Sequence, residues 1–499
     1  MSRISQNIII SGLTIFVLRL SGLVRDFYLL KRIGVNVMSD LIVTTIAVPD
    51  IIVGTLFVGG LNLAIIPHLK INEFLTWNKL VFPWMVVVLT AAFILSGLVY
   101  FFPAKAFQLF APGINLSKIS NLPVIMNFVS ISIPMAAVAI IFSLVLQVRG
   151  RFLVNGLGPI FTNLSVIMGI YISFSVANPT ILIVKSVAIG FLMRMLLYLA
   201  FIEEKQNTVL YNQRLLPTVE SIRSFWIGFR SLLLILLIPI ILRAMSSFYA
   251  EGSLTIVSYS LKFYEVPVGL FLASVNMVLF PKFCEFYAEG NFSKVQSYTK
   301  NSLEILFLGA VSIILIFYLL KNSVIEHIFA RMGIQTEDAV NILNLTTFFL
   351  FALPFGAGAS LLTSYFNSIE KEKTVLKSVA ISFLIFLASA LFFRRYPTVT
   401  LLSISFIAFN TTFFFQLFHK ANLVPQNIPM FLNINRFLLG VFLLTVWLAK
   451  LYLLYKANSH NIFTDIIMSC AVFLAFFYFL IKTQKDKLQN TINKPGMGK

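Results

Sequence analysis

The sequence predicts an all-α polytopic membrane protein, and three observations lead to this fold class. First, 59% of the 499 residues are hydrophobic, only 11% are charged, and the mean hydropathy is +0.91. Second, apolar runs of about 20 residues alternate with short charged connections, which suits spanning helices better than barrel strands of roughly 10 residues. Third, no polar stretch between the runs is long enough to bury a core of its own, so no soluble domain is expected.

The apolar runs predict fourteen transmembrane helices. Lys and Arg are more frequent in the segments that are cytoplasmic when the N-terminus is inside. Because the number of spans is even, both termini, including the Lys-rich tail, are then predicted to be cytoplasmic. The first six spans are expected at residues 8–30, 40–67, 79–103, 123–148, 157–176 and 180–202. The next eight are expected at residues 224–248, 254–280, 302–320, 340–366, 374–392, 397–418, 430–453 and 462–481.

Composition and spacing exclude several classes of function. The net charge of +19 comes from basic residues scattered along membrane borders, which follows the positive-inside rule and does not indicate nucleic acid. The two cysteines, Cys284 and Cys470, lie far apart and predict neither a disulfide framework nor a metal site. Since no Walker phosphate loop, metal-ligand spacing or nucleophile arrangement is found, the sequence predicts a transporter without a cofactor rather than an enzyme.

A faint internal repeat relates the spans. In the second span Asn62 is followed five residues later by Pro67, and in the eighth span Asn276 is followed in the same way by Pro281. An offset of six spans keeps the orientation of the helices, which predicts two pseudo-symmetric six-helix lobes related by an axis along the membrane normal. The predicted units are residues 1–215 for the first lobe, 216–422 for the second lobe, and 423–499 for two additional helices and the basic tail.

The first span contains charges where hydrocarbon is expected. Arg19, Gly22 and Asp26 are spaced i, i+3 and i+7, which places them on one stripe of a helix, with Arg25 on a neighbouring stripe. Charges inside a spanning helix are costly and generally face a hydrated cavity or a partner. The first span therefore predicts a polar pathway, with Gly22 leaving space beside the charges.

Two ordered sets of residues resemble the MurJ/MviN family of lipid II flippases. The first is Thr14-x4-Arg19-x2-Gly22-x2-Arg25-Asp26, followed by Gly34, Asp40, Pro49 and Pro67. The second is Tyr259-x2-Lys262-x2-Glu265-x-Pro267-x-Gly269, followed by Pro281. Members of this family resemble exporters built from two six-helix lobes and add two C-terminal helices that form a groove for a lipid tail.

The resemblance implies a substrate, a place and a set of site residues. The substrate would be lipid II, an undecaprenyl-pyrophosphate-linked disaccharide-pentapeptide. The protein would move it by alternating access across the bacterial cytoplasmic membrane. The resemblance also implies the cell-wall synthesis machinery as a partner. Arginine suits the pyrophosphate because its planar fork donates paired hydrogen bonds to phosphate oxygens. The expected substrate-binding cations are Arg19, Arg25 and Lys262, the expected acidic cavity residues are Asp26, Asp40, Asp50 and Glu265, and the expected hinge or packing residues are Gly22, Pro49 and Pro267.

Some positions depart from the family pattern. After the proline of the second span, a basic residue and a Glu of the family are replaced by Val53 and Val58, and an Asp before Lys262 is replaced by Leu261. Two alternatives therefore stand beside the flippase. One is an exporter of another polyprenyl-linked oligosaccharide or of an amphiphile, and the other is a scaffold that no longer transports.

Three expectations concern the partners of individual charges. Arg19 and Asp50 are each about fifteen residues from the first turn, so at roughly 1.5 Å per residue they should lie at one depth and approach each other in at least one transport state. Lys262 and Glu265 are spaced i, i+3 and could satisfy each other instead of contacting substrate. Arg25 and Arg243 could instead extend toward the external membrane border.

Overall fold

The structure is a computed structural model that describes residues 3–69, 81–119, 121–149, 151–176, 178–202, 216–369, 371–396 and 398–421. All regular structure within these ranges is helical, which confirms the predicted fold class. The two predicted C-terminal spans and the unit 423–499 lie outside the described residues.

The first group of helices comes from the N-terminal half. It comprises α1 (Arg3–Ile33), α2 (Val37–Val53), the π-helix η1 (Gly54–Val58), α3 (Gly59–Leu69), α5 (Phe82–Phe101), α6 (Pro103–Phe110), the short η3 (Leu116–Lys118), α7 (Leu122–Val148), α8 (Phe152–Ser173) and α9 (Pro179–Phe201). The second group comprises α10 (Val219–Ser246), α11 (Ser253–Ala288), α12 (Phe292–Val324), the π-helix η4 (Ile325–Phe329), α13 (Thr336–Leu350), α14 (Leu353–Ser368), α15 (Glu372–Phe393), the short η5 (Val399–Leu401) and α16 (Leu402–Lys420).

Each of the first twelve predicted spans corresponds to one helix or to one interrupted helix. In the part of the chain that the structure describes, eight helices are long and apolar enough to cross a membrane, or up to ten if each bent pair is one span. The charged helices α1 and α11 are not among them. The total of fourteen spans stays a prediction.

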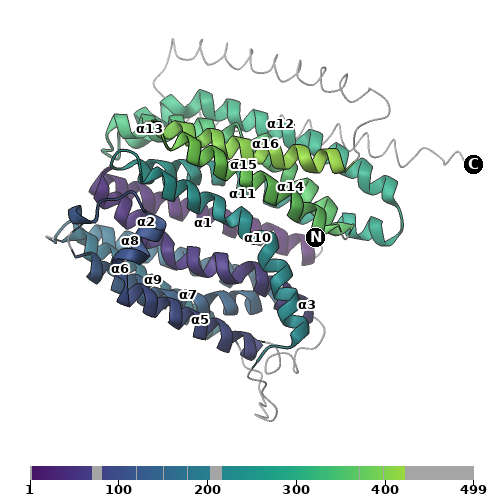
Figure 1. Ribbon diagram of the computed structural model, residues 1–499, viewed down its shortest axis with the longest axis horizontal. Helices are drawn as coiled ribbons and strands as arrows, with labels where there is room; N and C mark the ends of the chain where they lie inside the picture. Colours follow the sequence, from purple (N-terminus) through teal and green to yellow (C-terminus); the bar gives the residue numbers. More distant parts are fainter. Residues whose placement is uncertain are drawn as a thin grey trace, which may run out of the picture.

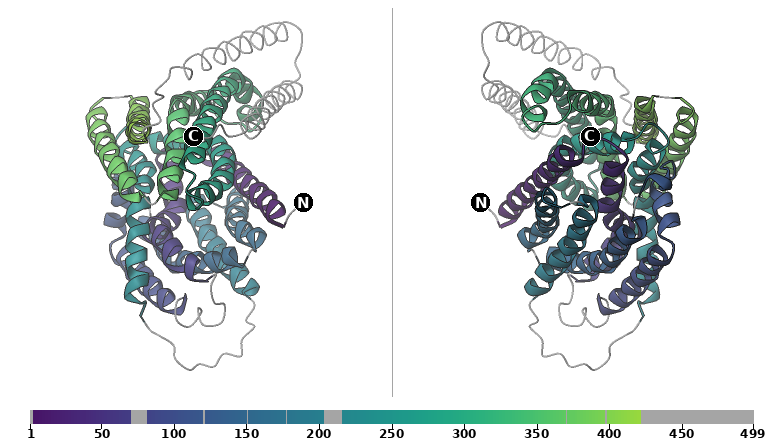
Figure 2. Two further views of the ribbon diagram at one scale, coloured as in Figure 1. Left: turned by 90° about the vertical axis from the view of Figure 1, so that its right-hand side faces the viewer. Right: turned by 90° about the vertical axis from the view of Figure 1, so that its left-hand side faces the viewer.

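Two large hydrophobic cores divide the bundle, and a small third cluster is formed by Ala139, Phe142, Leu146 and Tyr198 of α7 and α9. The larger core is built mainly from residues 29–191, with additional members from α11, η4 and α13, and the second core is built from residues 238–421. Figures 1 and 2 show the corresponding helices as two groups, one above the other, with α1 and α11 where the groups meet. The interface between the groups therefore contains the helices on which the sequence places its interior charges.

The turn between α1 and α2 packs against the turn between α10 and α11. A Cβ atom on Gly252, whose φ is +84°, would lie 2.3 Å from the side chain of Val35. Asp40 of α2 accepts hydrogen bonds from the backbone N–H groups of Gly252 (2.9 Å) and Thr255 (2.7 Å) and from the Thr255 hydroxyl (2.6 Å). A carboxylate at a helix N-terminus satisfies free N–H groups and the helix dipole, so Asp40 caps α11 from the other group. We call this end of the bundle, formed by residues 34–40 and 247–255, the sealed end.

Helix α10 contacts both groups. Its halves, Val219–Arg230 and Leu232–Ser246, meet at 41°. In the first half the ring of Phe225 occupies the space above Gly60 of α3, where a Cβ atom would lie 2.3 Å away, and Ser221 accepts a 2.6 Å hydrogen bond from the Trp84 indole. The second half contributes Ile238 to the second core. The α10 helix thus connects the two groups, as Figure 1 shows.

Prolines affect the spans in different ways. Pro49 lies inside α2, where it removes one intrahelical N–H, and the π-helix η1 begins five residues later. The tenth predicted span is broken, because α13 and α14 meet at 46° and Pro354 lies in the first turn of α14. By contrast, α11 continues past Pro267 without interruption. The expected hinge roles of Pro49 and Pro267 stay predictions.

Candidate functional site

An ion pair joins α1 to α11 at the interface between the groups. Arg19 Nη1 lies 2.5 Å from Glu265 Oε2. Both side chains are about one-third exposed, at 37% and 36%. An anion that enters the interface can therefore reach the guanidinium without unfolding either helix.

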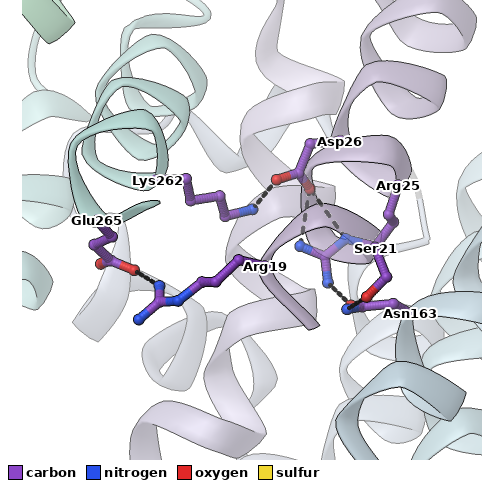
Figure 3. Close-up of polar contacts among 7 residues, drawn as sticks. All are labelled: Arg19, Ser21, Arg25, Asp26, Asn163, Lys262 and Glu265. Atoms are coloured by element: carbon purple, nitrogen blue, oxygen red, sulfur yellow. Dashed lines mark hydrogen bonds and ion pairs between the residues drawn. The ribbon is translucent and has the colours of Figure 1, made fainter. Parts of the chain in front are cut away.

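A second connection between the same helices is buried. Asp26 accepts hydrogen bonds from Arg25 Nε (3.0 Å) and Nη2 (2.8 Å) through Oδ1, and from Lys262 Nζ (2.6 Å) through Oδ2. Arg25 also donates to the amide oxygen of Asn163 on α8 at 2.9 Å, and Asn163 donates to Ser21 at 2.9 Å. Figure 3 shows these contacts side by side with the Arg19 pair. We call Arg19, Arg25, Asp26, Lys262 and Glu265 the central cluster.

The helical spacing of the sequence explains this arrangement. Arg19 and Asp26, seven residues apart, both contact α11, while Arg25 points to Asn163 on α8, as the predicted stripes require. Gly22 lies on the α8 side, where a Cβ atom would be 3.7 Å from the Asn163 amide nitrogen. This is an ordinary contact distance, so the backbone at Gly22 is close to α8 but not crowded.

Two alternative expectations for these charges are wrong. Lys262 and Glu265 do not satisfy each other, because each contacts a different residue of α1. Arg25 does not extend to the membrane border, since it is only 9% exposed and its guanidinium is held by Asp26 and Asn163. Charge-assisted hydrogen bonds of this kind compensate for the removal of the ions from water.

Two of the expected acidic residues lie outside the central cluster. Asp40 is buried at the sealed end, where it caps α11. Asp50 pairs with Arg194 of α9, with Oδ1 3.1 Å from Nη1, and does not pair with Arg19 in this conformation. The Asp50 side chain is 54% exposed whereas that of Arg194 is 10% exposed. The buried guanidinium of Arg194 therefore holds a carboxylate that remains half exposed.

The positions that depart from the family pattern are occupied by buried apolar side chains. Val53 is fully buried in the first core, and Leu261 is 2% exposed in the second core. Val58 is partly buried against the first core. These apolar residues therefore contribute to packing, and the polar interface is formed by other positions. Among the described residues, no group of three His, Cys, Asp or Glu side chains could hold a metal ion.

Two polar residues near the interface, Asn163 and Arg194, were not predicted from the sequence, and a third, Arg243, was predicted at the membrane border. Asn163 orients Arg25, Arg194 pairs with Asp50, and Arg243 of α10 lines a small cavity between α2 and α10. Each is a polar or charged residue within an apolar span, which is a signal that the sequence contains. For Arg243 the expected extension to the membrane border is wrong, because its Nε is buried.

Comparison with known proteins places this arrangement in a wider group. A family model described as lipid II flippase MurJ matches residues 30–473. A solved structure described as lipid II flippase MurJ in an inward closed conformation aligns with a TM-score of 0.77 at 18% identity, covering 96% of this chain and 99% of that one. No curated protein sequence matches the chain significantly.

More distant solved structures share the fold. An inward-facing multidrug resistance transporter of the MATE family aligns with a TM-score of 0.65 at 11% identity, covering 81% of this chain and 95% of that one. A transporter from Pyrococcus furiosus belongs, like the MATE transporter, to the MOP superfamily and is described as having a binding pocket of reverse polarity. It aligns with a TM-score of 0.58 at 11% identity, covering 84% of this chain and 96% of that one. These likenesses concern the fold alone.

Proposed function

This chain belongs to the lipid II flippase MurJ family, and we propose that it moves lipid II across the bacterial cytoplasmic membrane by alternating access, with the cations of the central cluster binding the diphosphate. The observation that carries the proposal is the pair of polar connections between α1 and α11, Arg19 to Glu265 and Lys262 to Asp26. Both lie between two apolar cores, where ionisable groups are expensive and generally mark a transport pathway.

The chemistry of the central cluster suits a diphosphate. The polar head of a lipid-linked sugar cannot cross hydrocarbon unaided, whereas its polyprenyl tail can remain in lipid. Arg19 and Lys262 present positive charge toward the interface, and an incoming phosphate would compete with Glu265 and Asp26 for them. Because these same carboxylates connect the two groups of helices, binding would weaken the connection and favour movement of one group relative to the other.

The proposed orientation of the bundle rests on the distribution of Lys and Arg along the sequence. We place both termini in the cytoplasm, so the sealed end faces outward and the central cluster is reached from the cytoplasmic leaflet. A reporter that is active only outside the cytoplasm should be silent when fused after Lys487 in the C-terminal tail. Activity of that fusion would reverse the orientation.

The two alternatives are less well supported. An exporter of another polyprenyl-linked oligosaccharide would need the same diphosphate site, but the family model that matches is that of lipid II flippases. A scaffold without transport would have no need to keep ion-paired charges between its halves. Contacts with the cell-wall synthesis machinery, if this chain makes them, belong to surfaces other than the central cluster.

Genetic complementation tests the proposal. In a strain depleted of its own lipid II flippase, the wild-type chain should restore growth, and Arg19→Ala should abolish growth at normal membrane abundance. Lys31→Ala is the matched control, because Lys31 is an exposed cation near the end of the same helix. Failure of the wild-type chain to restore growth would overturn the proposed substrate, and full growth with Arg19→Ala would overturn the site.

A further inference from the structure

Arg243 is a cation inside the bundle whose side chain makes no hydrogen bond or ion pair with any residue the structure describes. It lies in the second half of α10, and its Nε is buried without a partner. Its side chain borders a cavity of about 10 Å³ that is otherwise lined mainly by apolar residues of α2, α6, α10 and α11. Asp26 and Glu265 are the acidic residues close enough to attract it.

Both of those carboxylates already have partners. Asp26 is held by Arg25 and Lys262, and Glu265 is held by Arg19. Arg243 is thus an additional cation near a cluster whose acidic groups are occupied. Unpaired charges in a protein interior are strongly unfavourable and are uncommon unless a ligand completes them.

The backbone of Arg243 lies nearer to the sealed end than the central cluster does, because Arg243 is three residues, or about 5 Å, before the end of α10, and its side chain borders a cavity that extends to Thr44. Arg25 lies eight residues before the end of α1, and Lys262 lies nine residues after the start of α11. Thr44, which lines the same cavity as Arg243, lies seven residues after the start of α2. At a rise of about 1.5 Å per residue, all three positions are roughly 10–14 Å from the sealed end.

The charge balance indicates the kind of ligand. The central cluster contains three cations and two carboxylates, so with Arg243 it has four positive and two negative charges and a net charge of +2. A diphosphate that bridges a lipid and a sugar carries about one negative charge per phosphate, which neutralises this excess. A neutral amphiphile would leave this excess uncompensated, and a monophosphate ester, although it carries a similar charge, lacks a second phosphate group that could contact Arg243 while the first contacts the central cluster.

We propose that Arg243 is an additional residue that binds the diphosphate of the lipid substrate, contributed by α10 to a site otherwise formed by α1 and α11. This inference rests on the proposed function and adds a third helix to it. The cavity beside Arg243 has room for roughly one water molecule, so a diphosphate reaches the guanidinium only when α2 and α10 move apart. The contact therefore forms in a transport state that is more open than this one.

Binding measurements on the purified full-length chain in lipid nanodiscs test the proposal. The ligands are undecaprenyl diphosphate and undecaprenyl monophosphate, and the variants are Arg243→Gln, Arg243→Lys and the control Arg223→Gln, which removes an exposed arginine of the same helix. Hydrogen bonds to charged groups contribute enough for Arg243→Gln to weaken diphosphate binding by about tenfold or more. Binding of the monophosphate should change by less than about threefold, and Arg243→Lys should retain part of the diphosphate affinity.

The outcomes separate the inference from the function on which it rests. If the wild-type chain does not prefer the diphosphate to the monophosphate, the proposed diphosphate site itself is overturned. If the wild-type chain shows the preference and Arg243→Gln keeps it unchanged, only the role of Arg243 is overturned. A purely structural role would instead lower the unfolding temperature of Arg243→Gln without changing the ratio of the two affinities.

Discussion

Asp40→Asn should release the sealed end. The Asp40 carboxylate accepts three hydrogen bonds from Gly252 and Thr255, and an amide in its place has one acceptor oxygen and no charge. The loss of one charge-assisted hydrogen bond is about 1.5–3 kcal/mol, and the loss of the interaction with the α11 dipole is about 0.3–1 kcal/mol. Together these raise the ratio of open to sealed molecules by roughly 20-fold to 700-fold, at about 1.4 kcal/mol per factor of ten.

The labelling rate of a cysteine beneath the sealed end measures this ratio. Thr44 is 6% exposed and lies one helical turn below Asp40, so Thr44→Cys should react slowly in the sealed state. The background chain carries Cys284→Ser and Cys470→Ser, which removes both native thiols. When a membrane-impermeant maleimide is added outside intact cells, Asp40→Asn should raise the labelling rate by tenfold or more, up to the point at which most molecules are open.

A neighbouring residue provides the control for this experiment. The Thr45 hydroxyl donates to the Ile42 carbonyl, so this hydrogen bond lies within α2 and does not cross the sealed end. Thr45→Val should therefore leave the labelling rate of Thr44→Cys within about twofold of the parent. This range allows for the small change in helix stability that a single substitution generally causes. An Asp40→Asn chain that is present at normal abundance and labels as slowly as Thr45→Val would refute the role of Asp40 in holding the sealed end.

Other substitutions test the packing and the ion pairs. Lys262→Arg should retain complementation, because the guanidinium can donate to the same carboxylate and binds phosphate at least as well. Gly60→Ala should lower the unfolding free energy in detergent by about 1–3 kcal/mol, because an aromatic ring already occupies the space of its Cβ atom. Gly97→Ala, with nothing near the new methyl group, should be neutral or stabilising by about 1 kcal/mol. Trp84→Phe should cost roughly 0.5–1.5 kcal/mol for its lost hydrogen bond to α10, measured in the same unfolding assay.

Helical periodicity predicted the central cluster well. The seven-residue spacing of Arg19 and Asp26 placed both on the side of α1 that contacts α11, and the resemblance supplied Lys262 and Glu265 as residues of the same site. Local spacing is sufficient here because side chains on a rigid helix point in directions fixed by 3.6 residues per turn. It could not say which acid pairs with which base, because that choice depends on the packing of the two helices.

Depth arithmetic did not identify Arg194 as the partner of Asp50 in this conformation, because it gives no direction around the helix, and an approach of Asp50 to Arg19 in another transport state stays a prediction. Asp50 lies fourteen residues after Asn36, the N-cap of α2, and Arg194 lies fifteen residues after the start of α9. Asp50 and Arg194 thus lie at matching depths, as do Asp50 and Arg19. Depth alone therefore cannot decide which of the two arginines pairs with Asp50. The geometry of packing, which places α9 beside α2, decides between the two arginines.

The path of α10 has a consequence for the order in which the protein is made. The surface of α3 that includes Gly60 is completed by Phe225, which leaves the ribosome only after the connection that follows α9. A nascent chain that ends near residue 215 therefore holds a first half with an uncovered glycine surface and an unbonded Trp84 indole. Assembly in the membrane would then be cooperative across the midpoint of the chain, and two fragments divided at that point should be degraded when expressed separately but persist when expressed together.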